Sequence, residues 1–258
     1  MILIALMGAF VGFSLLWVYQ KRTGDAGIVD VAWSASVGII ASCFCWSAIG
    51  GNQTRRFLVA GLALLWAARL SWHVYQRLQK HSEDGRYVEM KQKWGDQTDK
   101  KMFRFYQFQA FASVLFALPM LIAAWNPTPF GMLDVIGIAI WFLALAGETI
   151  ADRQLDSFRN NPSNKGQVCK QGLWRFSRHP NYFFEWIHWW SYVFLAVSYP
   201  IGWLSIVAPF AMLFFILRVT GIPPTERQAL KSRGDLYRDY QRTTSAFFPW
   251  FPKSTSIN

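Results

Sequence analysis

Seven apolar stretches of roughly 20 residues constrain the fold of this 258-residue chain more than any other feature. That length is what an α-helix needs to cross the hydrocarbon core of a bilayer. The hydrophobic content of 53% also exceeds the roughly 45–50% of a typical soluble domain. We therefore predict an all-α membrane protein with seven transmembrane helices. They are expected at Ile2–Tyr19, Ile28–Ile49, Phe57–Tyr75, Phe105–Trp125, Phe130–Ala151, Tyr182–Tyr199 and Ile201–Val219.

The charged residues lie between these stretches and predict the orientation. Lys and Arg number 26 against 15 Asp and Glu, and they concentrate in 77–104, in 152–178 and after Arg218. The positive-inside rule places these segments in the cytoplasm, with the N-terminus outside and the C-terminus inside. Arg55 and Arg56 fall on the opposite side and are the exception. A nucleic-acid-binding surface would not alternate with apolar runs, so no nucleic acid is expected.

The simplest partition is a single membrane domain over 1–258, divided into 1–104 with three helices and a loop, and 105–258 with four helices. No internal repeat interrupts it. The short turns 126–129 and 198–200 are expected to join adjacent antiparallel helices. The first apolar stretch lacks a basic n-region and a cleavage pattern, so it is interpreted as a retained span.

Several classes of site have no support in the sequence. Cys43, Cys45 and Cys169 form no CxxC pair and have no His at metal-ligand spacing, so neither a disulfide framework nor a metal site is expected. The chain also lacks GxGxxG, GxxxxGK[ST], HExxH and GxSxG. A dinucleotide would have to bind within the helices.

The strongest candidate for chemistry is a carboxylate in an apolar, Trp-rich run. Asn181, Glu185 and His188 are spaced i, i+4, i+7 and share one helical face. In a low-dielectric site Glu185 is expected to keep its proton near neutral pH and to donate a hydrogen bond to a substrate carbonyl. The alternative is a buried Glu that only ties helices together. Intramembrane ionisable groups are functional candidates by default.

Two other segments repeat this pattern. Glu148, Asp152 and Arg159 lie near one face if their helix continues past the membrane surface, and they predict a polar lining. The alternative is a solvated helix end with an ordinary ion pair. Asp30 is a lone carboxylate in an apolar run, and Trp33 lies one turn away, so both are candidates for the substrate site.

Four cations precede the sixth stretch: Lys170, Arg175, Arg178 and His179. Guanidinium groups bind phosphates in bidentate fashion, so the segment is a candidate for pyrophosphate or ribose phosphate recognition. Binding of lipid headgroups by the same cations explains the pattern equally well.

Aromatic side chains in the tail and in the third-span region are further candidates. Tyr237 and Tyr240, spaced i, i+3, can flank an adenine or nicotinamide ring, or pack against the bundle instead. Arg86, Tyr87 and His73 are weaker candidates of the same kind.

The segment GLWRFSRHPNYFFEW at 172–186, preceded by DRQLDSFR at 152–159, resembles the C-terminal region of the steroid 5α-reductases. It also resembles the bacterial membrane proteins grouped with them and, more distantly, the sterol C14 reductases. Tyr237-x-x-Tyr240 through Phe248-Pro249 fits the same pattern. The resemblance covers roughly 145–250; the first hundred residues agree mainly in hydropathy and around Asp30 and Arg86-Tyr87.

The resemblance implies a seven-helix reductase that uses NADPH to saturate a C=C bond conjugated to a ketone, with a 3-oxo-Δ4 steroid or similar lipid as substrate. Glu185 matches the catalytic Glu that hydrogen-bonds the ketone. Asn181, Asp152 and Arg159 match cofactor contacts. Tyr182, Tyr240 and the basic cluster are added to these by proximity. A bacterial member would lie in the inner membrane among its lipids, with the cofactor site facing the cytoplasm, and a monomer is compatible with this sequence.

The chain departs from the family pattern at three places. Glu148 stands where the family has an Asn, and Asp30 stands at the place of a Gln in the second span. The Tyr that partners the catalytic Glu is matched equally by Tyr87 and by His73.

A membrane methyltransferase that uses S-adenosylmethionine is the alternative. Enzymes of the isoprenylcysteine and phospholipid type carry a similar RHPxY segment and an aromatic C-terminus. They often have a Glu-Glu pair after the last span, whereas this chain has Thr225-Glu226-Arg227. We therefore favour the reductase.

Overall fold

A computed structural model describes residues 1–80 and 83–253 of the chain. Within these residues the regular secondary structure is helical. Six segments are long and apolar enough to cross a membrane, which confirms a multi-pass helical protein by length and composition. They are Ile2–Thr23, Ile28–Ser47, Gln53–Gln79, Gly85–Trp125, Met132–Asn160 and Gly202–Arg233.

The apolar stretch predicted at Tyr182–Tyr199 is covered by α7 (Pro180–Ala196), which has 17 residues. Helix α7 stops early because Val197–Pro200 forms a turn, in which Tyr199 N–H bonds to the carbonyl of Ala196 at 2.9 Å. At 1.5 Å per residue α7 is about 26 Å long, short of the roughly 30 Å hydrocarbon core. A seventh crossing and the orientation of the termini stay predictions.

The contacts within the described chain form two compact units, Met1–Asp134 with Tyr192–Ala208, and Val135–Ser191 with Pro209–Asn258. These are groupings of contacts, so the single membrane domain stays a prediction. The first unit contains α1 (Ile2–Thr23), α2 (Ile28–Ser47), α3 (Gln53–Lys80), α4 (Gly85–Trp94), α5 (Thr98–Trp125) and the 3₁₀ turns η1 (Gly95–Gln97) and η4 (Gly202–Ile206).

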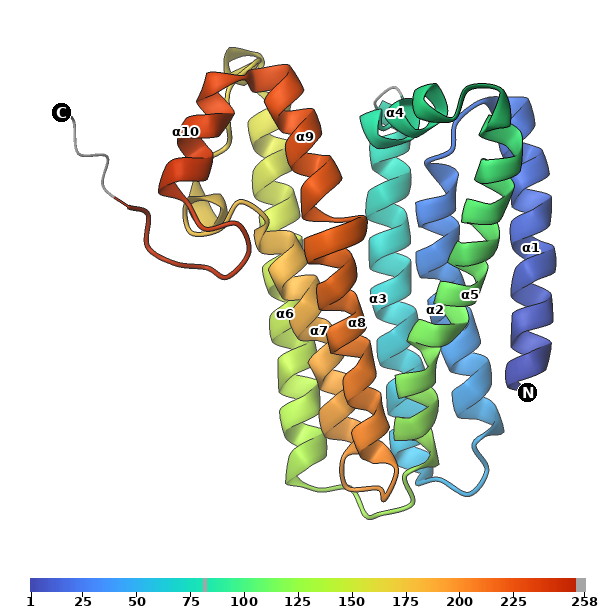
Figure 1. Cartoon of the computed structure of the whole chain (residues 1–258). Coiled ribbons are helices and arrows are strands. Elements are labelled where there is room, and N and C mark those ends of the chain that lie inside the picture. Colours follow the sequence, from blue (N-terminus) through green and yellow to red (C-terminus); the bar gives the residue numbers. More distant parts are fainter. Residues whose placement is uncertain (81–82, 254–258) are drawn as a thin grey trace. The chain divides into compact units, whose positions relative to one another are not determined.

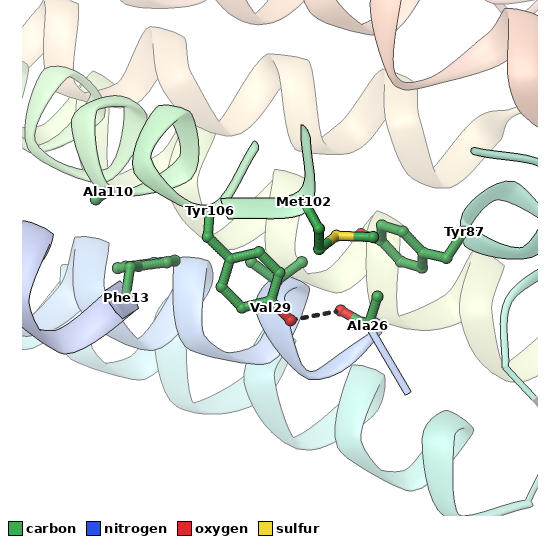
Figure 2. Packing of buried hydrophobic residues seen from close by; sticks show 7 residues of the cluster. All are labelled: Phe13, Ala26, Val29, Tyr87, Met102, Tyr106 and Ala110. Atoms are coloured by element: carbon green, nitrogen blue, oxygen red, sulfur yellow. Dashed lines mark hydrogen bonds between the residues drawn. The ribbon is translucent and has the colours of Figure 1, made fainter. Parts of the chain in front are cut away.

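In the first unit α2 packs along α3 and α5, and α1 packs mainly on α5 (Figure 1). Short α4 lies at one end of these helices (Figure 1) and contributes Tyr87 to the buried cluster shown in Figure 2. There Tyr106 donates a hydrogen bond to the carbonyl of Ala26 at 3.3 Å, so its ring can be buried without leaving the hydroxyl unpaired. The cluster consists of Phe13, Ala26, Val29, Tyr87, Met102, Tyr106 and Ala110.

A buried arginine organises the opposite end of this unit. The Arg55 side chain is fully buried and pairs with Asp134 through Nε and Nη2 at 2.6 and 2.8 Å. Its remaining donors bond to the carbonyl oxygens of Asn126, Thr128 and Pro129 at 2.9 to 3.3 Å. A buried guanidinium with every donor used and a carboxylate beside it is no longer an uncompensated charge. Because its charge is compensated in this way, Arg55 can lie on the predicted outer side of the membrane, where few cations are expected.

Arg56, the other exception, also has a structural role. Its guanidinium donates to the carbonyl oxygens of Cys45 and Trp46 at the end of α2. Carbonyls in the last turn of a helix need such partners, so Arg56 helps to cap α2, together with the N–H of Ala48 on the Cys45 carbonyl. The positive-inside rule concerns charges that stay in solution. It therefore does not apply to these two arginines, whose guanidinium groups are bonded within the protein.

The second unit consists of α6 (Met132–Asn160) from Val135 on, α7 up to Ser191, and the C-terminal part of α8 (Val207–Phe214) from Pro209, with α9 (Ile222–Arg233) and α10 (Asp235–Thr243) (Figure 1). Helix α6 continues to Asn160, past the end of the predicted apolar stretch at Ala151. The predicted polar face of Glu148, Asp152 and Arg159 needed this extension. A π-helical turn, η5 (Phe215–Val219), follows α8, and 3₁₀ turns η2 (Pro162–Asn164) and η3 (Gly172–Arg175) lie between α6 and α7.

The tail folds back onto the segment before α7. Ser177 donates from its hydroxyl to the carbonyl of Phe247 at 2.8 Å, and Trp250 N–H bonds to the carbonyl of Phe176 at 2.9 Å. Tyr240 donates to the carbonyl oxygens of Trp174 and Ser177. The Trp-Arg-Phe-Ser-Arg-His segment is therefore held in place by residues more than 60 positions away in the sequence.

Replacing Arg55 by Met is expected to lower the free energy of unfolding by about 3–5 kcal/mol, because Asp134 is left as a buried, unpaired charge. The double variant Arg55→Met/Asp134→Leu removes both charges and should recover most of that loss. Denaturant unfolding in detergent micelles measures both. A loss below about 1 kcal/mol in the single variant would show that the pair does not hold this end together.

Candidate active site

The candidate residues fall into two groups, one in each unit. Asp30, Trp33, His73, Arg86 and Tyr87 belong to the first unit. The remaining candidates belong to the second: Glu148, Asp152, Arg159, Lys170, Arg175, Arg178, His179, Asn181, Tyr182, Glu185, Tyr237 and Tyr240.

In the first unit the Asp30 carboxylate is the meeting point of α2 and α4. Tyr87, which is buried, donates its hydroxyl to Oδ1 of Asp30 at 2.7 Å, and Arg86 Nη2 lies 3.1 Å from Oδ2. Arg86 also pairs with Asp84, the residue that caps α4. Burial alone would raise the pKa of the Asp84 carboxyl, but the charge and hydrogen bonds of Arg86 hold that pKa below its usual value. The structure thus brings together three residues that the sequence predicted only separately.

Trp33 and His73 lie elsewhere in the same unit. The Trp33 ring packs edge-on against Trp66 and Phe116, at 6.1 and 5.7 Å between centroids. Its indole N–H is buried without a hydrogen-bond partner among the described residues. His73 is half-buried on α3. An apolar cavity of about 630 Å³ lies between α1 and α2 and includes Phe13, Ser36 and Phe44 in its wall.

In the second unit α6 and α7 run antiparallel and in close contact. Asn181 Nδ2 donates to Oδ1 of Asp152 at 3.1 Å, at the charged end of the pair. Further along, a Cβ on Gly147 would lie 2.4 Å from the Phe184 ring, so only glycine permits this approach. The structure therefore joins Asn181 to the α6 lining, a contact that the sequence analysis did not predict.

Glu185 lies on the face of α7 that is turned into the unit. It is 9% exposed, and its Oε1 accepts the indole N–H of Trp189, one turn later, at 3.0 Å. His188 and Trp189 beside it are at most 1% exposed. The predicted inward face of Asn181, Glu185 and His188 is formed. Trp189 as the donor to Glu185 was not foreseen, although the spacing of four residues would have allowed it.

Arg178 and His179 meet on the carboxylate of Glu226 in α9. Arg178 Nε lies 2.7 Å from Oε1, and His179 Nε2 lies 3.2 Å from the same oxygen. Gln241 donates to Oε2 at 2.7 Å, and Tyr237 donates to Oε1 at 3.3 Å. Burial lowers the pKa of His179 below its usual value, and the hydrogen bond to Glu226 offsets this only in part. His179 is therefore neutral at pH 7.

This Glu226 network was missed from sequence. Glu226 is an isolated acid in a basic tail, and that isolation is the one signal that could have indicated a partner cation. Nη1 of Arg178 also donates to the carbonyl oxygens of Gln241 and Thr244, so Nε and Nη1 already have protein partners. A role of Arg178 and His179 in phosphate binding stays a prediction.

The two tail tyrosines are packed inside the second unit. Their rings meet edge-on at 5.9 Å between centroids, and both are at most 6% exposed. Burial raises the pKa of both hydroxyls, which therefore act as neutral donors. Tyr182 stacks on His179 at 5.3 Å and bonds through its hydroxyl to Thr225. Contact of these rings with a cofactor stays a prediction.

Arg159, Lys170 and Arg175 are exposed at the charged end of the unit. Nearby, a cavity of about 550 Å³ has a mixed wall, in which Arg153, Gln154, Ser157, Asn161 and Asn164 lie with Ile150 and Phe158. One guanidinium with amides and a hydroxyl is a donor set that suits phosphate and ribose oxygens. The residues at this end therefore fit the polar half of a nucleotide.

Together these features define a helical, multi-pass membrane protein with buried acidic groups on its inner helix faces. The chain belongs to the family described as "Protein of unknown function (DUF1295)", whose model matches residues 16–244. It is also similar to the uncharacterized protein C594.04c of Schizosaccharomyces pombe, with 27% identity over 284 aligned positions that cover 95% of this chain and 79% of that protein. No solved structure matches the chain significantly.

The buried, neutral His179 gives a prediction for pH dependence. Because its folded-state pKa lies below the unfolded value of about 6.5, the unfolded chain binds more protons between the two values. The free energy of unfolding should therefore fall as the pH drops below about 6.5. In His179→Gln, which keeps a donor towards Glu226, this slope should be smaller. If the free energy of unfolding changed equally with pH in the wild type and the variant between pH 7.5 and 5.5, this role of His179 would be contradicted.

Proposed function

We propose that the protein is an NADPH-dependent reductase of the C=C bond of an α,β-unsaturated ketone. The observation that carries the proposal is the α6–α7 pair, which buries Glu185 beside Trp189 one turn from the Asn181–Asp152 contact. The resemblance of 145–250 to the steroid 5α-reductases supports it, because Glu185, Asn181 and Asp152 are the matched positions. Buried carboxyl groups in membrane helices are usually functional.

Each residue then has a defined task. When bound, NADPH supplies the hydride for the β-carbon. Glu185 donates a hydrogen bond to the ketone oxygen and stabilises the charge that develops there; a preorganised donor of this kind contributes about 3–4 kcal/mol. Asp152 and Asn181 contact the polar part of the cofactor, and Arg159, Lys170 and Arg175 at the charged end bind its phosphates.

The proposed substrate is a steroid or another lipophilic enone that reaches the protein through the bilayer. The apolar cavity of about 630 Å³ in the first unit supports binding of a ligand of that size and polarity. Trp33 stays a candidate substrate contact from sequence alone. The proposed setting is a bacterial inner membrane, crossed seven times, with the cofactor site and the C-terminus in the cytoplasm. The basic segments support this orientation.

A second candidate, methyl transfer from S-adenosylmethionine, is favoured by one observation. Glu226 follows the last apolar helix and binds directly to the Arg-His pair of the RHPNY segment. A carboxylate and a guanidinium side by side would complement the ammonium and carboxylate of that cofactor. The proposal remains the reductase, because this network already satisfies Glu226 internally.

Ligand-induced stabilisation separates the two candidates. At 100 times its dissociation constant a ligand adds about 2.7 kcal/mol to the stability of the folded protein. Purified protein titrated with NADPH should unfold at a higher temperature, and S-adenosylmethionine should have no effect. Stabilisation by S-adenosylmethionine alone would overturn the reductase proposal.

The role of Glu185 is tested by Glu185→Gln, which keeps the size of the side chain and removes the acid. NADPH affinity should stay within about threefold, while enone turnover should fall by about 10²–10³-fold, the usual cost of losing one such donor. Steady-state kinetics with NADPH fluorescence titration measures both. Phe142→Leu on the exposed side of α6 is the control, because Phe142 is 58% exposed. Turnover at the wild-type rate in Glu185→Gln would remove Glu185 from this role.

A further inference from the structure

The facing sides of α6 and α7 carry a column of buried ionisable groups. Asp152, Glu148 and Glu185 are 6, 5 and 9% exposed, and His188 is 1% exposed. Phe142 and Ile150, on the other side of α6, are 58 and 48% exposed. These four buried groups therefore lie on the face of each helix that is turned into the unit.

Three contacts set the register of the two helices. Asp152 meets Asn181, the ring of Phe184 lies against Gly147, and the ring of Trp141 lies 6.4 Å from that of His188. Asp152 is thus nearest the charged end of the pair. Glu148 comes next, one turn from Asp152 on α6, and Glu185 lies one turn from Asn181 on α7. His188 lies farthest from the charged end.

The column reaches well into the helix pair. At 1.5 Å per residue, Asn181 and His188 are separated by about 10 Å along α7. Helix α7 as a whole spans 17 residues, so this is close to half its length. Ionisable groups at such depth are costly in a bilayer, and chains of Asp, Glu and His in membrane helices typically conduct protons.

A donor at the deep end is consistent with this role. The Trp141 side chain is 1% exposed, and its indole N–H has no hydrogen-bond acceptor among the described residues. A buried donor of this kind takes an internal water or a ligand atom as its acceptor. Water next to His188 would continue the chain of hydrogen bonds that a proton needs.

We propose that Asp152, Glu148, Glu185 and His188 form a proton path from the charged end of α6–α7 into the unit. The inference rests on the proposed function for its purpose, since saturating a C=C bond consumes one hydride and one proton. The path supplies the proton, which forms the C–H bond at the α-carbon; the hydride, with its electron pair, comes from the dihydronicotinamide, which is oxidised. Glu185 or His188 gives up the proton and regains one from water through Glu148 and Asp152.

The first test needs no cofactor or substrate. In ¹⁵N-histidine-labelled protein in lipid nanodiscs, NMR measures how fast the ring N–H of His188 exchanges with water, and His188→Gln identifies its signal. Glu185→Gln should slow this exchange at least tenfold, because an amide does not carry a proton onward. Phe142→Leu should leave the rate unchanged.

If Glu185→Gln does not fold, Glu148→Gln serves as the second variant. The NMR signal of His179 shows whether each variant is folded. Exchange at the wild-type rate in whichever of these variants folds would overturn the path. This result is independent of whether the protein reduces an enone.

The second test uses turnover. In His188→Gln, kcat should fall by about 10²-fold or more, the usual size of a lost proton-transfer group, with the KM for the enone unchanged. The solvent deuterium isotope effect on kcat should rise, because proton delivery becomes limiting. An unchanged kcat with an unchanged isotope effect would show that His188 carries no proton for the reaction. Absence of enone reduction in the wild type would instead overturn the proposed function and leave the exchange result to decide the path.

Discussion

Every buried charge of a membrane protein must find its partners inside the protein, and this constraint shapes both units of the chain. Arg55 and Asp134 satisfy each other in the first unit, and Arg178 pairs with Glu226 in the second. In each case the guanidinium also donates to main-chain carbonyl oxygens, in Arg178 through Nη1. Removing one partner would leave a desolvated charge, which costs several kcal/mol. These pairs therefore fix the turns and tail segments that the apolar helices alone would leave loose.

The same constraint separates structural charges from candidates for chemistry. Arg55 has all its donors occupied by Asp134 and by main-chain carbonyl oxygens, so its role is to hold three chain segments together. Glu185 lies instead on a face shared with His188, one turn from the Asn181–Asp152 contact. The glycine at 147 brings the two helices close enough to enclose this face. This buried carboxyl group is the one to which we assign polarisation of the ketone in the proposed function.

The long apolar helices and the polar faces of α6 and α7 could be predicted from sequence, because helical periodicity and bilayer thickness act over a few turns. The contact between Asn181 and Asp152, which joins two such faces, was not predicted. The partners of Arg55 and Arg178 could not be predicted, since Asp134 and Glu226 lie 79 and 48 positions away. Helices α4, α9 and α10 were expected to be basic loops. They form because Asp84 caps α4 and because the tail packs on the segment before α7.

The central claim is that the α6–α7 face of this DUF1295 protein supports reduction of an enone by a nicotinamide cofactor. Incubation of the purified protein with NADPH deuterated at C4 of the nicotinamide and a 3-oxo-Δ4 steroid, followed by mass spectrometry of the product, tests it most directly. The account predicts a saturated ketone with one deuterium at the β-carbon, and none in Glu185→Gln. No deuterium in the product, together with methyl transfer from labelled S-adenosylmethionine to a lipid acceptor, would contradict it.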